Sequence, residues 1–367
     1  MLTTRLPNSP RTECMSARTR IHSVGPGLSG WLVPWMLGVT WGLAVMAYLW
    51  RQRRRDTLVH IHFNHWLCCR LLVVGARILG MPTVVTFSTQ LWVARKNPAL
   101  RRAARWIDGI SLRRATRVIA LTQTQARRLV DAYSIAPARV CVIPDAIDAD
   151  AFRASADTDD IGDFRTRHAI PRDRKIALYL GRIRAEKGWR DLPDIARALA
   201  PDGFLLICGD GPDRAKLTAA MRLNAAEPNW SITGFVDQAE ARLALGVADV
   251  LILTSRREAF GSVMLEAMAC GVPAVAYRVG GLTEVSGSPP AIRLVEPGDK
   301  TAMIDAVRQI LDDPMAHAQL TRRGLARVQH FALSDAISAT MAVYRAIETD
   351  ASTAPRSVPE LQKKKAY

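Results

Sequence analysis

Short apolar runs alternate with amphipathic segments along most of this chain of 367 residues. A strand that is buried on both faces reads as a short continuous apolar run, whereas a helix repeats its apolar residues every three or four positions. Alternation of the two patterns indicates βαβ units around a parallel sheet. In the first half the predicted strands are 58–63, 83–87, 117–121 and 140–143, and the predicted helices are 66–80, 98–115 and 123–133.

The alternation begins again at Lys175 and runs almost to the end of the chain. Two doubly wound α/β domains are therefore predicted, and ligands of such domains bind at the carboxyl ends of the strands. In this half the predicted strands are 176–180, 203–208, 230–233, 249–253 and 273–277, and the predicted helices are 189–199, 213–223, 238–246, 262–270, 300–312 and 333–347.

The breaks in the pattern predict the domain boundaries. A stretch rich in Asp and Ala has no clear period and separates the two halves, as a linker would. The predicted parts are an irregular tail at 1–19, a Rossmann-like domain at 20–150, the linker at 151–172, a second Rossmann-like domain at 173–332, and a helix with a polar tail at 333–367.

Residues 28–50 contain no charged side chain and are followed by Arg51, Arg53, Arg54 and Arg55. Length and flanking charge suit a transmembrane helix whose Arg end faces the cytoplasm. A buried or membrane-surface helix of a soluble domain is the other interpretation, and the Pro and Gly residues inside the stretch fit both. The preceding residues 1–19 lack the apolar core of a signal peptide.

The net charge is +16, and it is concentrated in the first 150 residues, which carry 21 Lys and Arg against 7 Asp and Glu. Such a one-sided basic surface indicates an anionic partner, namely a membrane, a nucleic acid or a phosphorylated substrate, although it is also typical of a solvated soluble face. The six cysteines form no CxxC pair, which argues against a disulfide framework or a zinc site and favours a reducing compartment.

The strongest chemical pattern follows the apolar run 250–254. Glu258 falls in the loop after that strand, at the mouth of the predicted sheet, and Phe260-Gly261 then opens a helix whose free N–H groups can meet a diphosphate. Glu266 lies further along this helix, where its carboxylate can accept hydrogen bonds from a ribose diol. The alternative is an ordinary acidic helix start, in which Glu258 only offsets the helix dipole.

The segment 258–266 resembles the E-x7-E motif of the retaining glycosyltransferases of family 4, which have the GT-B fold. Other segments resemble family motifs in the family's order: the G-R-x-x-x-E-K-G loop at 181–188, the G-x-G-P turn at 209–212, the G-x-V segment at 234–236, the V-G-G-x-x-E turn at 279–284 and two weaker landmarks at 59–62 and 143–148. The resemblance spans about residues 57–345. It implies two Rossmann-like domains that face a cleft, with the acceptor on the N-terminal side.

By this resemblance, Arg182 and Lys187 hold the donor diphosphate, Glu258 hydrogen-bonds the sugar and Glu266 the ribose, and Phe260 and Gly261 supply backbone N–H groups. The remaining donor-side residues are Gly209, Gly211, Gly234, Gly280 and Gly281. Because Arg and Lys can neutralise the leaving diphosphate and no acidic metal-binding cluster is evident in the sequence, we expect no metal and no cofactor besides the nucleotide-sugar substrate. Retention through front-face attack is likewise implied by the family.

The sequence departs from the family in two places. The family carries His after the strand that corresponds to 83–87, whereas this chain has Ser88, which cannot supply a cationic imidazole. His62 and His65 on the neighbouring loop either compensate for this missing imidazole or are packing residues. The candidate catalytic residues are therefore Glu258, His62 and Ser88.

The N-terminal domain also reaches the segment 59–62 early, which indicates a missing or shortened first βαβ unit. The string at 25–30 fits G-x-G-x-x-G, but no acidic residue follows at the distance that a nicotinamide site needs.

The predicted helix 98–115 interleaves apolar residues with arginines, namely Arg101, Arg102, Arg105, Arg113 and Arg114. This pattern suits a helix that lies on an anionic leaflet, and no nucleic-acid-binding module is recognisable, so we expect a membrane partner and no nucleic acid.

The sequence therefore predicts a bacterial enzyme, cytoplasmic and peripheral on the inner face of the membrane. We expect it to transfer a hexose from a nucleotide diphosphate sugar to a glycan or lipid-linked acceptor in polysaccharide, lipopolysaccharide or glycolipid synthesis. The alternatives are a non-catalytic GT-B protein that binds nucleotide sugar or scaffolds polysaccharide assembly, and an integral membrane protein anchored by residues 28–50.

Overall fold

A computed structural model describes residues 2–4, 12–16, 19–24, 45–51, 57–63, 67–88, 97–153, 158–224 and 229–353 of the chain. The chain divides into two compact units. The first unit comprises residues 1–119, 129–141 and 337–367, and the second comprises residues 120–128 and 142–336.

The second unit is built around a six-stranded sheet with the order β10-β9-β8-β11-β12-β13. Neighbouring strands run parallel throughout. The chain order advances in one direction from β8 to β10 and in the opposite direction from β11 to β13, so the order reverses between β8 and β11. The strands are β8 (Lys175–Leu180), β9 (Gly203–Cys208), β10 (Trp230–Gly234), β11 (Val250–Leu253), β12 (Ala274–Tyr277) and β13 (Arg293–Val295).

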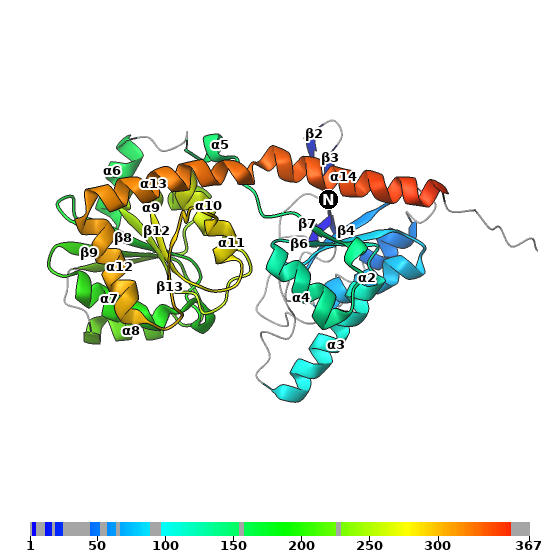
Figure 1. Ribbon diagram of the computed structural model, residues 1–367, viewed down its shortest axis with the longest axis horizontal. Helices are drawn as coiled ribbons and strands as arrows, with labels where there is room; N and C mark the ends of the chain where they lie inside the picture. Colours follow the sequence, from blue (N-terminus) through cyan, green and yellow to red (C-terminus); the bar gives the residue numbers. More distant parts are fainter. Residues whose placement is uncertain are drawn as a thin grey trace, which may run out of the picture. The chain divides into compact units, whose positions relative to one another are not determined.

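Each face of this sheet packs against its own apolar cluster. Strand β8 shows the alternation, because Ile176 and Leu178 point into one cluster while Ala177 and Tyr179 point into the other. Burial on both faces explains why the strands read as unbroken apolar runs in the sequence. Helices α7 (Leu192–Leu199), α8 (Arg214–Asn224) and α12 (Lys300–Asp312) cover one face, and α9 (Gln238–Val247), α10 (Ser262–Ala269) and α13 (Pro314–Val328) cover the other (Figure 1).

The first unit is built around a four-stranded sheet with the order β4-β5-β6-β7. Strands β4 (Val59–His62), β5 (Thr83–Thr86), β6 (Arg117–Ala120) and β7 (Val140–Val142) are linked by α2 (Leu67–Ile78), α3 (Pro98–Arg114) and α4 (Gln123–Tyr133). Helix α3 begins at an Asn97 side-chain cap and packs against α2. Between them lies a fully buried ion pair, in which Arg70 Nε is 2.8 Å from Asp108 Oδ1.

The last helix of the chain, α14 (Leu333–Thr353), contributes to the first unit through its C-terminal part. His60 on β4 hydrogen-bonds the Tyr344 hydroxyl through Nδ1 and Thr86 through Nε2, the latter at 2.8 Å. The pKa of His60 falls from its ordinary 6.5 to about 4, because burial disfavours the imidazolium and the nearby His62 repels it. His60 is therefore a neutral packing residue at pH 7.

Two parts of the fold differ from the sequence-based expectation. The expected irregular tail contains β1 (Leu2–Thr4) and β2 (Thr12–Ser16), which pair with β3 (Thr19–Val24). The expected linker contains α5 (Ala149–Arg153) and α6 (Thr158–Arg167). Phe164 of α6 is fully buried in the second unit's core, so tertiary packing stabilises a short helix whose local pattern is weak.

Three further elements, α11 (Leu282–Ser286), β13 and α13, were not predicted from the sequence. Most of the uncharged stretch 28–50, the glycine string at 25–30 and His65 lie outside the described residues, whereas 45–51 is helical. Within the described part of the chain, no helix has both the length and the apolar character needed to cross a bilayer.

The lowered pKa of His60 predicts a pH-dependent stability. Below pH 6.5 the unfolded chain takes up a proton that the folded chain accepts only near pH 4, so the free energy of unfolding falls as the pH drops through this window. Between pH 7.5 and pH 5 the expected loss is about 2 kcal/mol. Urea unfolding of the wild type and of H60Q at both pH values measures it, and H60Q should lack this part of the loss.

The exposed His330 provides the matched control. H330Q should keep the wild-type pH dependence. An equal pH dependence in the wild type and in H60Q would contradict the burial of a neutral His60.

Candidate active site

A short ion pair at the carboxyl edge of the second sheet joins the loops that follow β8 and β11. Lys187 Nζ lies 2.6 Å from Glu258 Oε2, and both side chains are partly buried, with exposed fractions of 27% and 13%. These loops flank the point where the strand order reverses. In open α/β sheets ligands bind at this switch point, so the residues predicted at 187 and 258 come together where a ligand site is expected.

Hydroxyl groups from β8 and from the residue after β11 hold the backbone of the Lys187 loop. The Tyr179 hydroxyl donates to the Arg182 carbonyl oxygen at 3.0 Å, and the Thr254 hydroxyl donates to the Lys187 carbonyl oxygen at 3.2 Å. Burial, together with the negative charges of Glu258 and Glu186, raises the pKa of Tyr179 far above its usual range. Tyr179 therefore remains a protonated donor, and the exposed Arg182 is held at the rim of the same loop.

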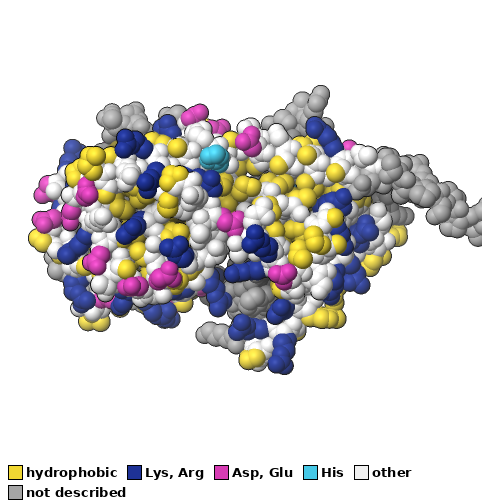
Figure 2. All heavy atoms as spheres, viewed as in Figure 1, with side chains coloured by type: hydrophobic (Ala, Val, Ile, Leu, Met, Phe, Trp, Pro, Cys, Tyr) yellow, Lys and Arg dark blue, Asp and Glu magenta, His cyan; other side chains and the backbone are white. Residues whose placement is uncertain are grey.

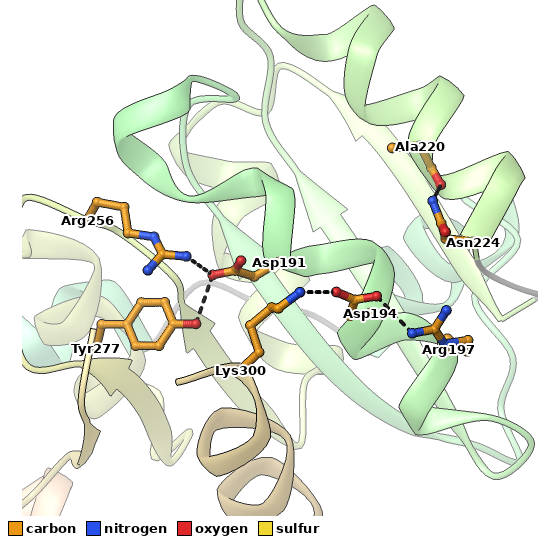
Figure 3. Close-up of polar contacts among 8 residues, drawn as sticks. All are labelled: Asp191, Asp194, Arg197, Ala220, Asn224, Arg256, Tyr277 and Lys300. Atoms are coloured by element: carbon orange, nitrogen blue, oxygen red, sulfur yellow. Dashed lines mark hydrogen bonds and ion pairs between the residues drawn. The ribbon is translucent and has the colours of Figure 1, made fainter. Parts of the chain in front are cut away.

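A buried carboxylate ties the segment after Lys187 to the segment before Glu258. Arg256 Nη2 and the Tyr277 hydroxyl converge on Oδ2 of Asp191, at 2.6 and 2.8 Å (Figure 3). The Arg256 backbone N–H also donates to the Glu186 carbonyl oxygen at 2.8 Å. The two loops that carry the Lys187–Glu258 pair are thus joined by side-chain and backbone bonds, and the pair is preorganised.

Backbones crowd together behind the pair. Gly280 has φ +56°, and a Cβ there would lie 1.6 Å from the Glu258 carbonyl oxygen. A Cβ at Gly209 would lie 1.9 Å from the Gly181 carbonyl oxygen. Only glycine fits at either position. The other predicted glycines also lie at this edge of the sheet: Gly211 after β9, Gly234 at the end of β10, Gly261 before α10 and Gly281 after β12.

Helix α10 starts without a side-chain cap at Gly261, which leaves its first N–H groups available to an anion. The Phe260 ring is buried against Phe331, with ring centroids 5.7 Å apart, so only the backbone of Phe260 can serve a ligand. Glu266 is half-buried, and burial raises the pKa of its carboxyl group while Arg242 offsets part of the rise.

The candidate residues of the first unit lie at the carboxyl ends of adjacent strands. His62 ends β4 and pairs in register with Thr86 of β5. Its exposed ring stacks on His60 at 4.6 Å between centroids. Ser88 follows β5, and its hydroxyl donates to the Phe63 carbonyl oxygen at 2.5 Å. The structure therefore brings His62 and Ser88 to one edge of their own sheet.

Glu284, from the V-G-G-x-x-E turn, has a structural role that the sequence did not indicate. Its carboxylate accepts the backbone N–H groups of Gln123 and Thr124, at 2.6 and 2.7 Å, where α4 begins. Burial alone would raise the pKa of Glu284, but the hydrogen bonds from Thr124 and Gln123 and the charge of Arg127 lower it overall. The turn therefore anchors the N-terminus of α4 within the second unit.

Comparison with known proteins identifies the family. The family described as Glycosyl transferases group 1 matches residues 160–327, and Glycosyltransferase Family 4 matches residues 2–151. A 2-deoxystreptamine glucosyltransferase from Streptomyces kanamyceticus is 31% identical over 311 residues, which cover 80% of this chain and 77% of the relative. The chain belongs to glycosyltransferase family 4. This glycosyltransferase is therefore an enzyme that uses nucleotide-sugar or related donors.

A second relative and a solved structure extend the comparison. A D-inositol 3-phosphate glycosyltransferase from Acidothermus cellulolyticus is 32% identical to this glycosyltransferase, over 78% of the chain and 66% of the relative. The sucrose-phosphate synthase structure from Thermosynechococcus elongatus matches with a TM-score of 0.78 at 23% identity, covering 95% of this chain and 89% of that one. The fold is GT-B, as the sequence predicted.

The crowding behind Glu258 predicts an unequal pair of glycine substitutions. G280A combines positive φ with a collision against a backbone oxygen, so it should displace Glu258, lower the free energy of unfolding by on the order of 3 kcal/mol and abolish transfer. Gly271 also has a positive φ of +71°, but the atom nearest to an added Cβ would be 3.6 Å away. G271A should therefore lower the free energy of unfolding by only about 1 kcal/mol and change the activity little.

Thermal or urea unfolding and a transfer assay on both variants measure this difference. Equal effects of G280A and G271A would contradict the tight contact between Gly280 and Glu258.

Proposed function

We propose that this glycosyltransferase moves a hexose from a nucleotide diphosphate sugar to a glycan or lipid-linked acceptor with retention of configuration. The observation that carries the proposal is the contact between Lys187 and Glu258 at the switch point of the second sheet. This contact places the Lys187 ammonium, which can bind a diphosphate, beside the Glu258 carboxylate, which can accept hydrogen bonds from sugar hydroxyls.

In the proposed reaction, Arg182 and Lys187 neutralise the diphosphate as the bond between the anomeric carbon and the phosphate oxygen breaks. The acceptor hydroxyl attacks the same face of the sugar, and its proton passes to the departing phosphate oxygen. Glu258 accepts hydrogen bonds from the sugar, and Glu266 accepts them from the ribose. The protein contributes positioning and electrostatic stabilisation, which are worth most when the groups are held in advance.

We assign the neutralising role to the two side-chain cations and propose that no metal is required. Arg supplies a planar fork of donors and Lys a compact charge, and together they suit a diphosphate. The uncapped start of α10 adds backbone N–H groups. Transfer should accordingly persist in a metal chelator.

Helix α3 supports the proposal of a membrane-bound acceptor and a peripheral position on the inner face of the membrane. Leu100 and Trp106 are 54% and 66% exposed, so this helix presents two large apolar side chains to the solvent. Arg101, Arg102 and Arg105 are exposed around them. Figure 2 shows Lys and Arg side chains beside hydrophobic ones over this helix, at the lower end of the view. Apolar insertion with arginine contacts to phosphates is the way in which an interfacial helix binds an anionic leaflet.

A small polyol is the second candidate acceptor, because the relatives are named for transfer to 2-deoxystreptamine and to D-inositol 3-phosphate. Assays with a lipid-linked glycan fraction and with free cyclitols separate the two candidates. Transfer to cyclitols alone would overturn the lipid-linked acceptor.

Removal of the Glu258 charge tests the proposed catalytic role. E258Q keeps the shape of the side chain, so it should lower kcat/KM by about 100-fold or more while the protein stays folded. A transfer assay with a nucleotide sugar and circular dichroism measure the two effects. E186Q is the matched control, since Glu186 lies in the Lys187 loop with a more exposed carboxylate. Full activity in E258Q would contradict the assignment.

Membrane docking through α3 is tested by vesicle binding. The triple variant R101Q/R102Q/R105Q should bind phosphatidylglycerol vesicles about tenfold or more weakly than the wild type, since each basic residue contributes about 1 kcal/mol near an anionic surface. W106S should also weaken binding, by loss of apolar insertion. Sedimentation with vesicles measures both, and R197Q/R222Q on the second unit should change little. Unaltered binding of the triple variant would contradict docking by α3.

A further inference from the structure

A polar cavity lies in the first unit, away from the residues proposed to bind the donor and from His62 and Ser88. Its volume is about 600 Å³, within the range of small-molecule sites. The side chains of Val74 and Ile78 give the cavity an apolar part. Five arginines also line it, namely Arg77, Arg113, Arg114, Arg117 and Arg139. None of the described residues that line it is acidic.

The cavity opens at the amino edge of the sheet. Arg117 is the first residue of β6, and Arg139 directly precedes β7. Arg113 and Arg114 end α3, and Arg77 is in the last turn of α2. His62 and Ser88 lie at the opposite, carboxyl edge. The arginine cavity is therefore separate from the predicted acceptor-side residues of this unit.

Helix capping explains only part of this cluster. The Arg139 guanidinium donates to the carbonyl oxygens of Arg113 and Ala115, and Arg117 donates to the Thr116 carbonyl oxygen. These bonds satisfy the end of α3, but carbonyl oxygens carry no full charge, and a helix terminus offers about half an elementary charge. Several cations thus face one cavity without an equivalent negative charge from its lining.

Two of the arginines are exposed and remain available. Within the described part of the chain, the guanidinium groups of Arg77 and Arg114 make no hydrogen bond or ion pair with another residue. Burial, together with the charges of Arg77 and Arg117, lowers the pKa of Arg139, which reflects the crowding of like charges. A bound anion would relieve this repulsion.

We propose that this cavity binds a phosphorylated anion with at least two negative charges. Arg77 and Arg114 would contact the phosphates, while Arg139, held by its carbonyl partners, presents its remaining donors from the wall. Planar guanidinium groups bind phosphate oxygens in pairs, and the apolar stems leave room for the carbon skeleton that carries the phosphate. A soluble phosphate ester and a phospholipid headgroup share this chemistry. The proposal does not depend on the donor site.

Calorimetric titration of the full chain with pyrophosphate at low ionic strength tests whether the cavity binds an anion. R77Q/R114Q removes two exposed cations without breaking a fold contact, so it should remain folded and bind about tenfold or more weakly. R102Q/R105Q changes the charge of the same unit equally, but away from the cavity, and should bind within about twofold of the wild type.

The proposed donor site also has cations that can bind pyrophosphate, so K187Q is titrated in parallel. The arginine cavity predicts binding that persists in K187Q and is about tenfold or more weaker in R77Q/R114Q. Equal affinity of R77Q/R114Q and the wild type, or an equal loss in R102Q/R105Q, would overturn the proposal.

The source of the phosphate is resolved with vesicles of phosphatidylglycerol in phosphatidylcholine. If a headgroup fills the cavity, pyrophosphate should displace the wild type from the vesicles, and R77Q/R114Q should bind the vesicles more weakly. If the ligand is soluble, R77Q/R114Q should bind pyrophosphate more weakly and keep its vesicle binding. Both results support an anion site, and they assign its ligand differently.

Discussion

The reversal of strand order between β8 and β11 is the constraint on which the rest of the second unit depends. The connections that follow these two adjacent strands run to opposite faces of the sheet, to α7 after β8 and to α10 after β11, so they leave a crevice at the carboxyl edge. The loop after β8 carries Lys187, and the loop after β11 carries Glu258. Because the two loops line the same crevice, this topology places the cation and the carboxylate within 2.6 Å of each other.

The surroundings of this pair are arranged to keep it in place. Asp191 binds Arg256 and Tyr277, and the Arg256 backbone bonds to the segment that carries Lys187. Gly280 lets a third loop touch the Glu258 backbone, with no space for a side chain. A site that neutralises charge in a transition state works best when its groups need no rearrangement, and these contacts supply that rigidity. Backbone contacts alone thus require glycine at two positions of the family motifs, Gly209 and Gly280.

Local pattern predicted most of the fold because the buried strands are continuous apolar runs. Strand β9 begins and ends where the sequence placed it, and α12 does as well. The three-residue edge strand β13 and the five-residue α11 are too short to show a period, and α6 depends on the burial of Phe164. The motifs also indicated which residues meet at the sheet edge. The partners of Asp191 and Glu284 could not be predicted, because these bonds join residues between 65 and 161 positions apart.

The most direct measurement is thermal unfolding of the wild type, R182Q and K187Q with and without UDP, GDP and ADP. If Lys187 and Arg182 hold the donor diphosphate beside Glu258, one nucleotide should raise the unfolding temperature of the wild type by a few degrees at saturating concentration. The same nucleotide should have little effect on K187Q and a reduced effect on R182Q. Stabilisation that is undiminished in both variants, or none with any nucleotide, would contradict a donor site at the switch point between β8 and β11.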